Sequence, residues 1–67
     1  MENVMHREID RLNFITKERG VDEMIRFAKQ GVEQYSRALQ TPYGKVYKEE
    51  LTGSISVFKQ HIKFFET

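Results

Sequence analysis

Apolar residues recur along the chain at spacings of three and four, and they do so in three separate segments. In the first segment they are Met5, Ile9, Leu12 and Ile15. This spacing places all of them on one side of an α-helix. The solvent-facing side collects the charged residues Arg7, Asp10, Arg11, Lys17 and Glu18. The pattern therefore predicts an amphipathic helix over residues 2–19.

The second segment has the most regular pattern of the chain. Its apolar seam has the alternating spacing of a heptad repeat and consists of Val21, Ile25, Ala28, Val32, Tyr35 and Leu39. Met24, Gly31 and Ala38 flank this seam at intervals of seven. Gly31 lowers helix propensity by about 1 kcal/mol, which a close contact with another helix would offset. We expect a helix over residues 22–40 with a neighbouring helix packed closely against it.

The third segment, residues 42–65, allows two interpretations. Ser54–Val57 alternates like a strand, and Thr52-Gly53 is a possible hairpin turn. On a helical wheel, however, one stripe collects Leu51, Ile55, Phe58, Ile62 and Phe65. A second stripe contains Val46, Val57 and Phe64. The opposite face is polar: Lys45, Lys48, Glu49, Thr52, Ser56, Lys59, Lys63 and Glu66. A hairpin would scatter these charges over both faces. We therefore predict one continuous helix, weakened near Gly53.

Helix-ending and helix-starting residues separate the three segments. Gly20 follows a basic stretch, as is typical of a helix end where glycine adopts a left-handed conformation. Thr41 is suited to cap a helix, and Pro42 to its first position, because proline has no amide hydrogen. The sequence thus predicts a single all-α domain over residues 1–67. Its expected architecture is a small three-helix bundle, in which a long helical hairpin joins an N-terminal helix.

Composition narrows the class of protein. The 67 residues include 11 Lys/Arg and 10 Asp/Glu, a net charge of +1, and 39% are hydrophobic. Balanced charge with many aromatic residues is unlike a disordered polyelectrolyte. There is no cysteine, so a disulfide framework and thiol chemistry are excluded. Apolar runs are too short for a membrane-spanning helix, and no signal peptide is recognisable at the N-terminus. We expect a cytoplasmic protein without membrane association.

Size and surplus apolar residues favour a partner. A chain this short has a small core, and disulfides, metals or partner subunits usually compensate for that. Phe27 and Phe14 point away from the seams of their own helices, and the third segment has a second stripe that includes Val57 and ends in Phe64. Grouped exposed aromatic residues usually mark contacts with other chains. We expect Phe27, Val57, Phe64 and Phe65 at an interface, and a symmetric homodimer in which Val57 and Phe64 meet the second subunit.

Catalytic and metal-binding patterns are weak. The candidate nucleophiles and bases are Ser36, Ser54, Ser56, His6 and His61. They form no Gly-x-Ser-x-Gly elbow, and no carboxylate lies at a telling spacing from either histidine. The two imidazoles belong to no recognisable ligand cluster. We expect ordinary helix-surface polar residues, no enzyme activity, no metal and no cofactor.

The start of the third segment suggests an alternative kind of site. A helix N-terminus attracts anions, Gly44 would let a phosphate approach the backbone, and Lys45 and Lys48 would add positive charge. Tyr43 and Tyr47 could stack on a base. This pattern predicts a possible anion, nucleotide or nucleic-acid site, although the glutamates on the same face and the small net charge oppose it.

The expected function is therefore binding. The favoured interpretation is a small helical regulator or inhibitor that acts through protein–protein contacts, of the kind made by phages and mobile elements. The alternative is a nucleic-acid or nucleotide-binding module that uses the tyrosines and lysines at the start of the third helix. Salt dependence separates the two, because phosphate-driven binding weakens steeply with added salt.

Overall fold

The computed structural model describes residues 4–66, and the side chains from residue 6 onward. Its elements are α1 (Val4–Arg19), α2 (Val21–Ala38), α3 (Pro42–Val46) and α4 (Lys48–Glu66). No strand occurs among the described residues. The predicted all-α class is confirmed. The helix expected at residues 2–19 is confirmed from Val4 to Arg19, while residues 2 and 3 lie outside the described part of the chain. The helix expected at 22–40 begins and ends within two residues of its predicted bounds.

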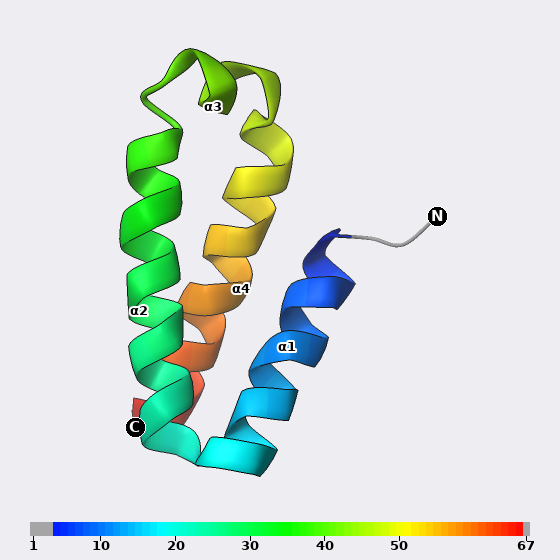
Figure 1. Cartoon of the computed structure of the whole chain (residues 1–67), viewed down its shortest axis with the longest axis vertical. Coiled ribbons are helices and arrows are strands. Elements are labelled where there is room, and N and C mark those ends of the chain that lie inside the picture. Colours follow the sequence, from blue (N-terminus) through cyan, green and yellow to red (C-terminus); the bar gives the residue numbers. More distant parts are fainter. Residues whose placement is uncertain (1–3, 67) are drawn as a thin grey trace.

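The long helices α1, α2 and α4 pack pairwise against one another. α2 and α4 run antiparallel along the longest dimension, and the short α3 joins them at one end (Figure 1). α1 begins well short of α3 and runs toward the opposite end (Figure 1). The upper parts of α2 and α4 therefore extend beyond the start of α1, and this difference in length positions the cavity described below.

Gly20 alone connects α1 to α2. Its φ of 96° and ψ of 167° lie in a region that is almost exclusive to glycine. Its amide donates to the Thr16 carbonyl at 3.0 Å, and its own carbonyl accepts from Met24 at 3.2 Å. The same residue thus ends one helix and starts the next. The prediction that Gly20 requires a positive φ is confirmed.

The prediction of one continuous helix over residues 42–65 is wrong. The helix is interrupted at Tyr47, whose φ of −109° and ψ of 27° are not helical, and not at Gly53, which lies inside α4. The interruption follows from the path of the chain. α3 crosses the end of the molecule, and α4 must then turn to run back along α2 (Figure 1). A straight helix from Pro42 would carry its apolar residues away from α2.

Two interactions hold α3 against the end of α2. The Thr41 hydroxyl donates to the Ala38 carbonyl at 2.6 Å and accepts from the Gly44 amide at 3.2 Å. Gly44 is buried, and a Cβ built on it would lie 2.5 Å from the Cα of Leu39. Only glycine allows this approach. The predicted capping role of Thr41 is therefore confirmed.

The core lies where the three long helices meet. Its buried members are Leu12, Met24, Ala28, Val57 and Phe58. Half-buried residues packed around them include Ile9, Ile15, Val21, Ile25, Val32, Tyr35 and Ile62. Most of the predicted stripes thus face inward. In α2, however, the deepest residues are Met24, Ala28 and Gly31, so the helix is rotated toward its small-residue flank.

Two residues expected at an interface belong to the interior of the single chain. Val57 is 3% exposed and sits in the core, because α1 packs on the side of α4 that was expected to meet a second subunit. Phe27 is half-buried, and its ring meets the Phe58 ring edge-on at a centroid distance of 6.2 Å. The expectation that Val57 and Phe27 are surplus to the core is wrong.

Candidate functional site

A polar cavity of about 250 Å³ lies between the start of α1, the end of α2, α3 and the start of α4. We call it the tyrosine cavity. Its lining residues are Arg7, Glu8, Arg11, Tyr35, Tyr43, Tyr47, Glu50, Leu51 and Ser54. All four helices contribute lining residues to it. The start of α1 is the end of that helix nearer to α3 (Figure 1).

Glu8 is the most unusual residue of the tyrosine cavity. It is 4% exposed, and its Oε2 atom is buried without a hydrogen-bond partner. Its Oε1 atom lies 4.0 Å from Nη1 of Arg11, a long ion pair whose arginine is about half exposed. A buried carboxylate oxygen without a donor is unfavourable by roughly 1–3 kcal/mol. The folded chain therefore holds an unsatisfied acceptor at this cavity.

Tyrosine rings form much of the cavity wall. Tyr43 lies in the first turn of α3 and Tyr47 directly follows that helix, with ring centroids 4.6 Å apart. Tyr35 packs against Phe58 at 5.5 Å. Burial raises the pKa of Tyr35, the nearby Glu8 carboxylate raises it further, and Arg11 opposes the shift. These influences all act within the same cavity, so its polar groups are electrostatically connected.

Sequence reasoning missed the two buried polar side chains of the cavity, Glu8 and Ser54. Ser54, expected on the helix surface, is 2% exposed. Glu8 was not singled out at all. A signal was present, because Glu8 lies four residues before Leu12 and so shares its helix face. A charged residue on an apolar helix face indicates either a buried polar interaction or a site.

A second candidate surface lies at the other end of α4. We call it the aromatic end, and it comprises His61, Phe64 and Phe65. Phe64 is 73% exposed and Phe65 36%. Their ring centroids are 4.9 Å apart, and His61 stacks on Phe65 at 6.5 Å. Together with Asn13 and Gln60 they line a hollow of about 340 Å³.

Two interactions fix the aromatic end in place. His61 Nδ1 lies 3.0 Å from the Val57 carbonyl, one helical turn earlier. Lys29 of α2 forms an ion pair with Glu66 at 3.2 Å, which ties the last turn of α4 to α2. The two phenylalanines are therefore presented from an ordered helix. Of the four residues expected at an interface, Phe64 and Phe65 are at the surface of the chain.

The residues of the predicted anion site lie in two different hollows. Tyr43 lines the tyrosine cavity, whereas Lys45 and Lys48 line a separate hollow that also contains Glu49 and Glu50. Tyr47 borders both. The expectation that Gly44 leaves room for a phosphate is wrong, because the end of α2 occupies that space and the Gly44 amide is bonded to Thr41.

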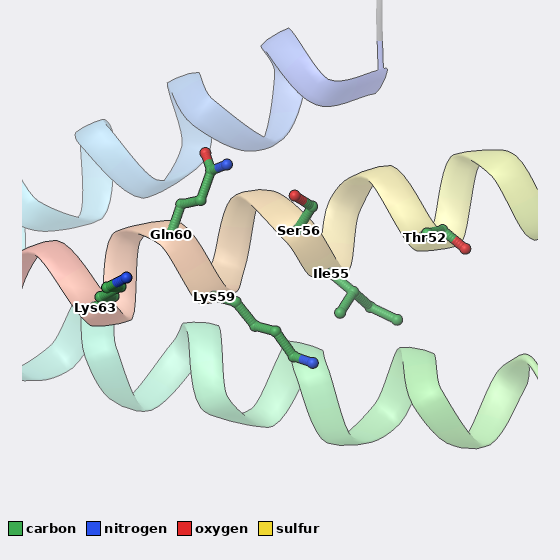
Figure 2. A pocket seen from close by; sticks show the side chains of 6 residues that line it. All are labelled: Thr52, Ile55, Ser56, Lys59, Gln60 and Lys63. Atoms are coloured by element: carbon green, nitrogen blue, oxygen red, sulfur yellow. The ribbon is translucent and has the colours of Figure 1, made fainter.

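The polar face of α4 forms a shallow groove of about 350 Å³. Figure 2 shows its lining side chains along α4, with Gln60 on the side of α1 and Lys59 on the side of α2. Lys59 and Lys63 are exposed, neither forms an ion pair among residues 6–66, and the groove is lined by no buried polar side chain. It fits the solvated lysine face predicted from the sequence.

The described residues contain neither a cluster of metal-ligating side chains nor a helix that could span a membrane. No group of three or more His, Asp or Glu side chains is arranged to hold a metal ion among residues 6–66. Within the described helices, none combines the length and the apolar character needed to cross a bilayer.

Comparisons with known proteins leave the geometry as the basis for a functional conclusion. The chain matches no family model, and neither a curated protein nor a solved structure is significantly similar to it.

Proposed function

We propose that this protein is a small non-enzymatic binding protein, a helical regulator or inhibitor that acts through protein–protein contacts made by its aromatic end. The observation that carries this proposal is the exposure of Phe64 and Phe65 side by side on an ordered helix. Adjacent exposed phenylalanines are costly in water and are typical of contact surfaces.

The first partner we propose is a second copy of the chain. The buried core contains few large side chains, so a second subunit would add apolar burial that the single chain lacks. In a symmetric dimer the two aromatic ends would face each other, and one substitution would alter the interface twice. Val57 has no part in this dimer, since it lies in the core.

Sedimentation of the wild-type chain over a range of concentrations tests the dimer. We expect a monomer–dimer equilibrium that Phe64→Glu shifts to monomer. The matched control is Lys59→Glu, an exposed substitution on the groove face of the same helix, which should leave the equilibrium unchanged. A wild-type chain that remains monomeric at high micromolar concentration would overturn self-association.

Nucleic-acid or nucleotide binding is the second candidate function. The observation in its favour is that Lys45, Lys48 and Tyr47 border one hollow of about 350 Å³. Fluorescence anisotropy with a labelled single-stranded oligonucleotide tests it. If this function holds, binding should weaken steeply as salt is added and should fall on Lys45→Gln and Lys48→Gln. A protein contact through the aromatic end should depend little on salt.

A further inference from the structure

We propose that the tyrosine cavity binds a small ligand through a protonated primary amine, which donates to the carboxylate of Glu8 while the apolar body of the ligand lies against the rings of Tyr43 and Tyr47. This site lies at the start of α4, whereas the aromatic end lies at its last turn. The inference therefore goes beyond the proposed function and does not depend on it.

The unsatisfied carboxylate oxygen determines which kind of group the cavity would take. Oε2 of Glu8 is an acceptor, it is buried, and the described residues supply no donor for it. Oε1 lies 4.0 Å from Nη1 of Arg11, a long contact with a side chain that is about half exposed. A ligand that supplies an N–H donor would form a charge-assisted hydrogen bond, which is about twice as strong as a neutral one.

The walls of the cavity favour a positively charged donor. The faces of tyrosine rings attract cations, most strongly where water is excluded. Tyr43 and Tyr47 are 60% and 41% exposed, with ring centroids 4.6 Å apart. They thus form one aromatic wall that is open to an incoming ligand. Glu8 lines the same cavity, so a ligand whose ammonium binds there shares its space with these two rings.

Size and charge limit the ligand further. A cavity of about 250 Å³ is smaller than the usual site for a drug-sized molecule, so it suits one ring or a short chain with an amine. The lining includes two arginines, Arg7 and Arg11, as well as the acids Glu8 and Glu50. A carboxylate near the ammonium could reach an arginine. The shared chemistry is the ammonium, and the source is either a simple amine or an amino acid.

Titration followed by nuclear magnetic resonance tests the proposal with a matched pair of probes. Phenethylamine and phenylalanine share the ring and the ammonium and differ in the carboxylate. We expect saturable shifts of the ring protons of Tyr35, Tyr43 and Tyr47 for at least one probe, with a Kd in the millimolar range. Tighter binding of phenylalanine assigns the amino acid as ligand, and tighter binding of phenethylamine assigns the simple amine.

Variants identify the role of Glu8. Glu8→Gln keeps the volume but removes the charge and should weaken binding of the better probe about tenfold. Tyr43→Leu should weaken binding of the same probe several-fold. Because Tyr43 is exposed, this variant tests the proposal even if Glu8→Gln fails to fold. Glu18→Gln, an exposed acid on the same helix, is the control and should bind like the wild type.

Three results would overturn the proposal. The first is the absence of saturable shifts for both probes at concentrations on the order of tens of millimolar. The second is unchanged binding by both Glu8→Gln and Tyr43→Leu. The third is that inorganic phosphate, but neither probe, shifts the same tyrosine signals, because that would assign the cavity to an anion held by its arginines.

Discussion

The ring of Phe58 occupies the space that a side chain on Gly31 would need. A Cβ built on Gly31 would lie 2.8 Å from Cδ2 and 3.0 Å from Cζ of that ring. Phe58 is 1% exposed and is also in ring contact with Phe27 and Tyr35. It cannot move aside without disturbing the core. The absence of a side chain at Gly31 therefore sets how closely α4 approaches α2.

Gly31→Ala should lower the free energy of unfolding by up to about 2 kcal/mol, even though alanine is the better helix former. Overpacking a core usually costs about 1–3 kcal/mol, while the gain in helix propensity is about 1 kcal/mol. Urea denaturation measures the difference. The double mutant Gly31→Ala, Phe58→Leu should lose less stability than the two single mutants together, because the smaller side chain at position 58 removes the clash. A stabilised Gly31→Ala chain would show that the helices separate freely.

Gly20→Ala should destabilise the chain by about 1–3 kcal/mol, because a non-glycine residue is strained at its backbone angles. Space is not the cause, since a Cβ at this position would have nothing within 4 Å. Thermal denaturation of a chemically synthesised chain with D-alanine at position 20 separates the two effects. D-alanine favours positive φ, so it should restore most of the lost stability. Equal destabilisation by both isomers would contradict the backbone explanation.

Substitution by glutamate should distinguish Val57 from Phe64. Val57→Glu places an unpaired charge in the core and should cost about 3–5 kcal/mol, enough to unfold much of the population. Phe64→Glu alters a side chain that is 73% exposed and should change monomer stability by less than about 0.5 kcal/mol. Circular dichroism during urea denaturation at low protein concentration measures both. Similar effects of the two substitutions would contradict the assignment of Val57 to the core.

Glu8→Met should stabilise the free chain by about 1 kcal/mol, because it removes the unsatisfied buried oxygen and fills the same space with apolar atoms. Urea denaturation without added ligand measures this gain. Glu18→Met, at an exposed position of α1, should stay within about 0.5 kcal/mol of the wild type. A Glu8→Met chain that is less stable than the wild type would mean that the contact of Glu8 with Arg11 outweighs its desolvation.

Stability should fall in alkaline solution partly because of Tyr35. Burial and the Glu8 carboxylate raise its pKa from the ordinary value of 10.0 in the folded chain. The unfolded chain then releases this proton first as the pH rises. The stabilisation that Tyr35 contributes is complete below about pH 10 and is lost as the pH increases through the raised pKa of the folded chain. In urea denaturation, the free energy of unfolding of Tyr35→Phe should therefore fall less steeply at alkaline pH than that of the wild type. An equal fall in both chains would contradict the raised pKa of Tyr35.

The sequence by itself determined the elements and most of their inward faces. Spacings of three and four identify helices because only one side of each can leave water, and this logic placed Leu12, Ala28, Phe58 and their neighbours correctly. The positive φ of Gly20 and the capping role of Thr41 were also predictable, since both depend on the residue and its immediate neighbours. Phe64 is exposed, as expected for a residue outside the stripe that faces the core.

Only the tertiary structure decided how those helices meet. The interruption at Tyr47 comes from the turn of the chain over the end of α2, which no local pattern encodes. Val57 is buried because α1 covers a second side of α4, and this depends on the relative rotation of two helices that are distant in sequence. The tyrosine cavity likewise needs four helices to bring Glu8, Tyr35, Tyr43 and Ser54 together. Periodicity fixes which side of a helix is apolar, but the distances between side chains on different helices follow from packing alone.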